Sequence, residues 1–154
     1  MSIFQSMNTT ASALTAQRLR MDVISSNMAN EDTTHGKLVN GKWVPYTRKT
    51  VVLQPKENSF SSYLQSAINQ DGGTNSAGNG VMVTQIKDDT STPYKTVYDP
   101  GNPDANQDGY VQLPNVDPLR EMTDLISTTR SYEANVTVLN ASKGMMMKAL
   151  EIGK

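Results

Sequence analysis

The sequence predicts an α+β fold, in which long N- and C-terminal helices pack as an antiparallel coiled coil and a small β-rich domain is inserted between them in the sequence. Two observations carry this prediction. Apolar residues recur every seven positions at both ends of the chain, which is the repeat by which paired helices bury a common seam. The middle instead combines short β-branched segments with turns rich in Gly, Pro, Asn and Asp. We expect an N-terminal helical part at 1–35, an inserted domain at 36–117 with a flexible loop near 71–80, and a C-terminal helical part at 118–154.

The first predicted helix runs from about residue 3 to residue 30. No Pro or Gly occurs in the first 35 residues, and Ser2 and Gln5 have the spacing of a capping box. Polar residues occupy the opposite side, so the helix is amphipathic. Its expected apolar face, and hence its subunit interface, consists of Phe4, Met7, Ala11, Leu14, Met21, Ile24 and Met28.

The middle of the chain is expected to contain several short strands. Residues 46–55 are rich in β-branched side chains and end at a proline, which indicates a strand. Residues 59–70 have the spacing of a short helix or compact turn, and 71–80 have the composition of a loop. Residues 81–89 and 93–100 flank a turn and are predicted to pair as an antiparallel hairpin. Residues 109–113 are expected to add a short strand.

The last predicted helix runs from about residue 118 to residue 151. Asp117 is a suitable N-cap and Pro118 a suitable first helical residue. Acidic Glu121 and Asp124 near its start complement the helix dipole. Gly144 weakens the helix by about 1 kcal/mol relative to alanine. Its expected interface residues are Met122, Leu125, Tyr132, Val136, Leu139, Met146 and Leu150.

These heptads permit two interpretations. The two helices pair only with each other in one small bundle, or they also dock against helices of other subunits. The chain contains nine methionines, which suit adaptable contacts, and its middle is too polar to cover both helices. Each buried Leu, Met or Ile contributes about 1.5–3 kcal/mol, so a two-helix hairpin alone would be marginal. We therefore favour docking between subunits and expect the ends to be poorly ordered before assembly.

The composition excludes several classes of function. Lys and Arg number 14 against 15 Asp and Glu, so no basic excess indicates nucleic acid or an anionic membrane. The absence of cysteine excludes disulfides, thiolate metal sites and cysteine nucleophiles. The N-terminus lacks the pattern of a secretory signal, and no segment reaches the ~18–20 apolar residues of a membrane span.

The segment 102–117 begins like an EF-hand calcium loop. Asp104, Asn106, Asp108 and Gly109 occupy the first, third, fifth and sixth loop positions. The twelfth position is Asn115, which cannot supply the bidentate carboxylate, and prolines lie on both sides of the loop. We therefore interpret these residues as turn formers. The alternative is a calcium-binding interaction module that uses Asp104, Asn106 and Asp108.

No other group of residues forms an active site in the sequence. His35 is the only histidine, and its neighbours indicate an exposed turn. Trp43 is the only tryptophan, for which local packing is favoured over a partner contact. No phosphate-binding loop occurs. The chain is therefore expected not to be an enzyme and to use no cofactor. Asn27 and Asn30 instead have the spacing to end the first helix and orient the segment that follows.

Three segments together resemble the bacterial flagellar basal-body rod and hook proteins. "VISSNMANEDTT" (23–34) resembles the motif that ends the family's first helix, and 129–154 is similar to its closing helix. The segment 97–117 looks like that of the proximal rod subunit of the C type. The matching motif residues are Ser26, Asn27, Met28, Ala29, Asn30, Tyr132, Glu133, Ala134 and Asn135.

The resemblance implies a structural subunit of the rod that crosses the periplasm or cell wall and transmits torque. It implies export without a cleaved signal through the flagellar type III apparatus, followed by helical assembly with the terminal helices in the inner core. The implied partners are other copies of the chain, other rod proteins and the export apparatus, with no nucleic acid and no direct membrane insertion. A soluble coiled-coil adaptor is a further alternative.

Overall fold

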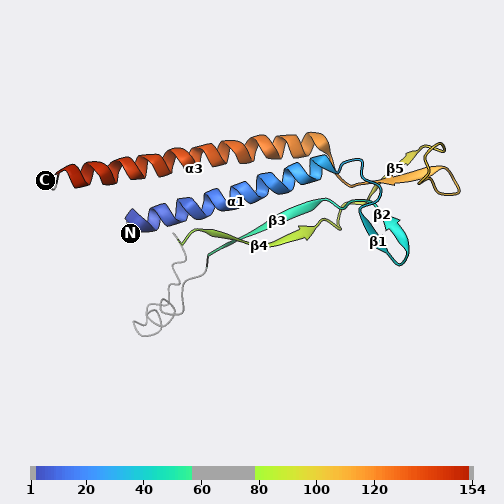
Figure 1. The fold of residues 1–154 in the computed structure, drawn as a ribbon, viewed down its shortest axis with the longest axis horizontal. Helices are drawn as coiled ribbons and strands as arrows, with labels where there is room; N and C mark the ends of the chain where they lie inside the picture. Colours follow the sequence, from blue (N-terminus) through green and yellow to red (C-terminus); the bar gives the residue numbers. More distant parts are fainter. Residues whose placement is uncertain (1–2, 57–78, 153–154) are drawn as a thin grey trace, which may run out of the picture. The chain divides into compact units, whose positions relative to one another are not determined.

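The computed structural model describes residues 3–56 and 79–152. Within these ranges the chain is α+β, as predicted, with a helix at each end and short strands between them (Figure 1). The helices and strands are α1 (Ile3–Ala29), β1 (Lys37–Val39), β2 (Lys42–Val44), β3 (Lys49–Pro55), β4 (Val81–Asp88), β5 (Lys95–Tyr98), β6 (Tyr110–Leu113) and α3 (Pro118–Ile152).

The chain divides into two compact units. The first comprises Met1–Leu19, Val52–Gln85 and Thr129–Lys154, and the second comprises Arg20–Val51 and Ile86–Thr128. Both helices and the β3–β4 pair contribute residues to each unit. None of the helices in the described part of the chain is long and apolar enough to span a membrane.

The two terminal helices match their predicted bounds closely. Asp117 caps α3, because its Oδ1 accepts a hydrogen bond from the Leu119 amide at 3.2 Å. Its backbone carbonyl accepts the first helical bond, from the Glu121 amide at 3.0 Å. The helix continues through Gly144, beside which there is open space. Ser2, the segment 59–70 and most of the loop 71–80 lie outside the described residues.

The strands form three two-stranded sheets, β1–β2, β3–β4 and β5–β6. β1 and β2 are antiparallel, with Leu38 opposite Trp43. Their two-residue turn has Asn40 at φ 51° and Gly41 at φ 78°, the left-handed pair that favours Asn-Gly in tight hairpins. The sequence contained this hairpin signal, but the hairpin was not among the predicted elements.

The predicted hairpin between 81–89 and 93–100 is wrong. β4 pairs with β3, whereas β5 pairs antiparallel with β6, with Val97 opposite Val111. The intervening turn is tied elsewhere: the Asn115 side-chain amide donates to the carbonyls of Asp89 and Thr92, at 2.8 and 3.0 Å. These bonds draw the turn toward the segment before α3. The predicted strands at 46–55 and 109–113 are confirmed as β3 and β6.

The buried interior is small and unusually polar. The second unit buries Val23, Ile24, Val111 and Val116 together with Pro45 and Pro114, and the first unit buries Ala16. Asn27, Asn115, Glu121 and Thr128 are equally buried in the second unit, as are Thr10 and Ser142 in the first. A chain with so few buried apolar groups depends strongly on how its buried polar groups are paired.

Candidate functional site

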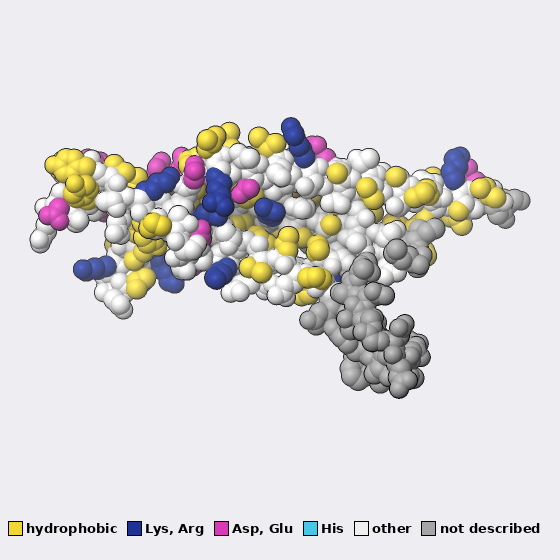
Figure 2. Space-filling model, turned by 180° about the vertical axis from the view of Figure 1, so that it is seen from behind, with side chains coloured by type: hydrophobic (Ala, Val, Ile, Leu, Met, Phe, Trp, Pro, Cys, Tyr) yellow, Lys and Arg dark blue, Asp and Glu magenta, His cyan; other side chains and the backbone are white. Residues whose placement is uncertain are grey.

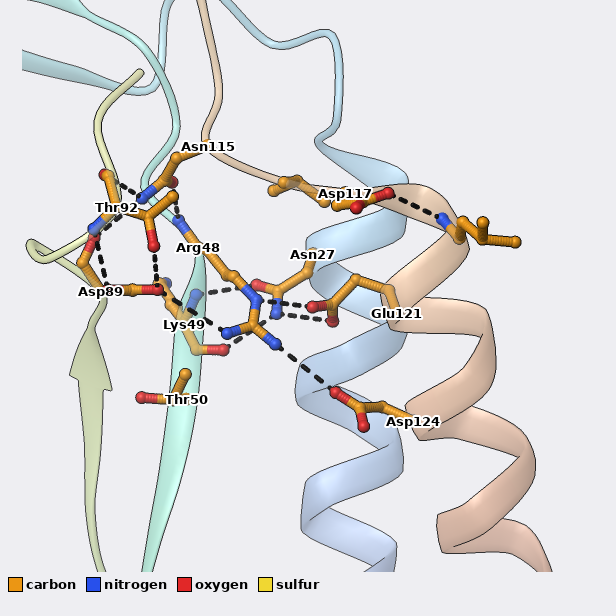
Figure 3. A network of polar contacts seen from close by, with 12 residues as sticks. Asn27, Arg48, Lys49, Thr50, Asp89, Thr92, Asn115, Asp117, Glu121 and Asp124 are labelled. Atoms are coloured by element: carbon orange, nitrogen blue, oxygen red, sulfur yellow. Dashed lines mark hydrogen bonds and ion pairs between the residues drawn. The ribbon is translucent and has the colours of Figure 1, made fainter. Parts of the chain in front are cut away.

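A network of buried polar side chains lies in the second unit, where α1 ends and α3 begins (Figure 3). We call this network the polar junction. It brings together side chains from the last turns of α1, the segment leading into β3, the turn after β4, the segment between β6 and α3, and the first turns of α3. Its members are Asn27, Arg48, Asp89, Asn115, Glu121 and Asp124.

Asn27 uses its side-chain amide as a connector between segments. Its Oδ1 accepts from the Lys49 amide at 2.9 Å and from the Tyr46 hydroxyl at 3.0 Å. Its Nδ2 donates to the Lys49 carbonyl at 2.9 Å and to Glu121 Oε2 at 3.0 Å. The side chain is 1% exposed and makes all four bonds of which its amide is readily capable. Asn27 therefore joins the end of α1 to both the start of β3 and the first turn of α3.

Arg48 provides the positive charge of the junction. Its Nε donates to Glu121 Oε1 at 2.6 Å, and Glu121 is fully buried. Its two terminal nitrogens lie 3.7 Å from Asp89 Oδ2 and 3.5 Å from Asp124 Oδ2. A buried carboxylate is tolerated only when paired and hydrogen-bonded, and Arg48 together with Asn27 meets this requirement for Glu121.

The turn after β4 is held by a second set of bonds. Asn115 Oδ1 accepts from the Arg48 amide at 2.7 Å, which links this turn, through Asn115, to the segment before β3. The Ser91 hydroxyl bonds to Asp89 Oδ1 at 2.5 Å and the Thr92 hydroxyl bonds to Oδ2 at 3.0 Å. These bonds, the one from Ser91 foremost, outweigh desolvation and hold the pKa of Asp89 at about 2, below its ordinary value of 3.8.

This arrangement is suited to holding segments in place rather than to reacting. Every buried side-chain polar atom of the junction has a hydrogen-bond partner. Within residues 3–56 and 79–152, no group of three or more His, Cys, Asp or Glu side chains is placed to hold a metal ion. The junction thus connects the end of α1 to β3 and to the start of α3. That Asn27 orients the segment after the first helix stays a prediction.

Asn30 acts more locally. Its Nδ2 donates to the Ser26 carbonyl at 2.8 Å, and its Oδ1 accepts from the Thr33 hydroxyl at 3.2 Å. Both bonds lie within the last turn of α1 and the residues that follow. Asn135, in the C-terminal motif, likewise bonds locally, to the Ser131 carbonyl at 2.9 Å.

Of the candidate calcium-loop residues, Asn106 forms a turn with its side chain, as predicted, whereas the Asp104 side chain contacts a distant segment instead. Asn106 Oδ1 accepts from the amides of Asp108 and Tyr110, at 3.0 and 2.9 Å. Asp104 Oδ1 lies 3.3 Å from His35 Nε2, and its Oδ2 accepts from the Thr34 hydroxyl at 2.7 Å. The side-chain oxygens of Asp104 and Asn106 are therefore engaged with protein groups, and no observation favours the calcium-binding alternative.

The predicted interface residues are partly covered within the single chain. Ile24 is buried, most others are half-buried, and Phe4, Ala11, Met122 and Leu150 are exposed. The structure adds exposed apolar residues of α3 that the heptad count did not include: Leu119, Ile126, Val138, Met145, Met147 and Ile152. Several of these also recur at multiples of seven, so a second heptad count along α3 would have found them.

The sequence did not identify most members of the polar junction. Asn27 was singled out for its place at the end of the first helix, whereas Arg48, Asp89 and Asn115 were not recognised as candidates. Glu121 was interpreted only through the helix dipole. The three buried polar residues of α3, Glu121, Thr128 and Ser142, are separated by multiples of seven, and this spacing was an available signal.

Comparison with known proteins gives a consistent result. Residues 7–36 match the family model described as flagella basal body rod protein, and residues 107–152 match the flagellar basal body rod FlgEFG protein C-terminal model. The chain is 65% identical over 154 residues to the flagellar basal-body rod protein FlgC of Bacillus subtilis, covering 100% of both chains. It is 44% identical to FlgC of Borreliella burgdorferi, covering 99% of this chain and 98% of that protein. It is 38% identical to FlgC of Salmonella typhimurium, covering 100% of both.

Proposed function

Because this chain belongs to the flagellar basal-body rod protein family, we propose that its terminal helices form the assembling part of a rod subunit and that the polar junction sets their geometry. The chain is a structural subunit of the basal-body rod, not an enzyme, and it assembles with other rod proteins of the flagellar basal body.

The observation that carries the proposal is the balance between buried and exposed apolar side chains. Among the described residues, five Ala, Val and Ile side chains and two prolines are buried, whereas eighteen large hydrophobic side chains are exposed. Hydrophobic side chains come to the surface in several places in Figure 2. Exposed apolar surface on this scale marks a chain that completes its core with partners. The polar junction, by contrast, is fully satisfied within the chain and needs no partner.

We assign an antiparallel coiled coil to α1 and α3, with 1–35 and 118–154 in the inner core and 36–117 as the inserted domain. The bond from Asn27 to Glu121 supports this assignment, because it places the end of α1 beside the start of α3. Heptad repeats in both helices support continued pairing from that point. The heptad residues named above are the proposed seam with neighbouring subunits, except Ile24, which is buried within the chain. Exposed residues of α3 such as Ile126 and Val138 extend it.

We further propose that the chain is exported through the flagellar type III apparatus without a cleaved signal and crosses the periplasm or cell wall as part of the rod. The small, polar interior supports passage in an unfolded state, since few apolar contacts would have to be broken. The absence of cysteine also suits a chain that moves between redox compartments. Folding is then completed by burial of the helix seams during assembly, and torque passes through many such contacts at once.

The seam is tested by introducing a charge into each helix. Leu139→Asp in α3 and Met21→Asp in α1 should abolish rod assembly and motility while secretion of the subunit continues. An unpaired charge in a helix seam costs several kcal/mol. Asn140→Asp is the matched control, because Asn140 is adjacent to Leu139 but exposed; this variant should assemble. Motile cells that carry both seam substitutions, with normal rods in purified basal bodies, would refute the assignment.

A further inference from the structure

The second unit contains a concave pocket that is separate from the polar junction. Its volume is about 370 Å³, within the range of small-molecule sites. It is lined by Lys42 and Trp43 of β2, by Asp104 and Asn106 of the turn-rich segment, and by Tyr110 and Gln112 of β6. The pocket thus draws on three separate parts of the sequence, and neither the rod assignment nor the polar junction accounts for it.

Two aromatic side chains in this pocket remain largely open to solvent. Trp43 is 56% exposed and Tyr110 is 45% exposed. Trp43 contacts the His35 ring edge-on with a centroid distance of 5.1 Å, and Tyr110 contacts Tyr98 in the same manner at 5.2 Å. Each ring is therefore held from one side while part of its apolar surface stays available to a ligand.

The polar side chains of the pocket offer both donors and acceptors. Asn106 is fixed by the two backbone amides that bond to its Oδ1, which leaves its NH₂ group as a donor. Asp104 is fixed by Thr34 and His35. In the described part of the chain, the side chains of Lys42 and Gln112 have no hydrogen-bond or ion-pair partner, so they can bond to a ligand.

We propose that this pocket binds a carbohydrate. A pyranose ring has an apolar C–H face that stacks on aromatic rings, and hydroxyl groups that both donate to and accept from amide and carboxylate side chains. Trp43 and Tyr110 provide the first kind of contact, and Asn106 and Gln112 the second. The single lysine is offset by Asp104, so the pocket has no cationic excess of the kind that selects phosphate or nucleic acid. The bonds that fix Asn106 and Asp104 reduce the ordering cost of binding.

The only tryptophan of the chain lines the pocket, so its fluorescence reports binding directly. The full-length protein is titrated with chitotriose, cellotriose and maltotriose, three neutral sugars that differ in substituents and linkage. We expect a saturable change in Trp43 emission with at least one of them. Gln112→Ala should weaken that binding about tenfold, the loss of roughly one hydrogen bond, and Tyr110→Ala by at least as much. Phe4→Ala, which removes an exposed aromatic ring from α1, should bind normally.

Circular dichroism of each variant shows whether it is folded. Trp43→Ala, which lacks the fluorophore, is followed by saturation-transfer NMR of the sugar protons and should lose the signal. The proposal is overturned if none of the three sugars gives a saturable change up to about 10 mM, well beyond the millimolar range of weak specific binding. It is equally overturned if folded Gln112→Ala and Tyr110→Ala variants bind as the unsubstituted chain does. Neither result bears on rod assembly, which depends on α1 and α3.

Discussion

Replacing Asn27 with alanine removes the side chain that joins α1 to β3 and α3. Four hydrogen bonds are lost at once: two to the backbone of Lys49, one from Tyr46 and one to Glu121. The partners differ in how easily water can replace Asn27. Lys49 is exposed and Tyr46 is half-buried, whereas Glu121 is fully buried and keeps only its bond to Arg48.

The cost follows from these differences. A buried polar group left without a partner costs about 1–3 kcal/mol, with charged groups toward the upper end. The Glu121 carboxylate therefore contributes most of the loss, and Lys49 and Tyr46 add less because water reaches them. We expect Asn27→Ala to reduce the free energy of unfolding by about 3–4 kcal/mol. Asn30→Ala is the matched control, because Asn30 bonds only within its own turn and should cost about 1 kcal/mol.

The assay is urea unfolding of the full-length chain, followed by the fluorescence of Trp43, which belongs to the same compact unit as the polar junction. The two asparagine variants are compared by their free energies of unfolding, which we expect to differ by about 2–3 kcal/mol. If the free energies of unfolding of Asn27→Ala and Asn30→Ala differ by less than about 0.5 kcal/mol, Asn27 is only a local helix terminator. The role assigned to the polar junction would then be wrong.

Two further predictions concern the backbone and the response to pH. Gly80→Ala should destabilise the start of β4 by about 1–3 kcal/mol, because Gly80 has a φ of +87° and an added Cβ would overlap Ser12 Oγ. Gly41→Ala is the control for backbone strain alone, because Gly41 has a similar φ of +78° but open space around it. Amide hydrogen exchange of β4 measures the effect of Gly80→Ala and that of β1 and β2 the effect of Gly41→Ala; equal losses of protection would exclude a role for the contact with Ser12. Asp89 has a folded pKa of about 2 against an ordinary 3.8, so its stabilisation is complete above about pH 4 and is lost as the pH falls toward 2. Ser91→Ala should reduce this loss in urea unfolding between pH 4 and pH 2, and an unchanged pH profile would contradict the assigned cause.

The turn-rich segment 99–109 shows how far local chemistry can be read from sequence. Asn and Asp side chains bond to amides two residues ahead, so their spacing alone indicates turns, and Asn106 and Asn102 make such bonds. The same locality explains the accuracy of the helix ends, since the Asp117 cap acts within its own first turn. The Asn40–Gly41 hairpin was equally local and could have been predicted from the same rules.

Strand partners could not be predicted in this way. The segments 81–89 and 93–100 have adequate strand composition and a turn between them, which favours a hairpin by proximity. Which strands pair instead depends on Asn115, which lies more than twenty residues along the chain from the turn that it holds. Such a bond has no signature near the turn itself.

The sequence by itself determined the two long helices, the Asp117 cap of α3 and the membership of the rod family, because each depends on neighbours a few residues apart or on motifs read along the chain. Only the tertiary structure decided that Glu121 is buried, that Arg48 pairs with it across 73 residues, and that Trp43 and Tyr110 line one pocket. A glutamate on a helix is ordinarily exposed, and burial of its charge becomes favourable only when distant residues supply the compensating bonds. Those distances are set by the fold as a whole, which is why the polar junction emerged from the structure and not from the heptads.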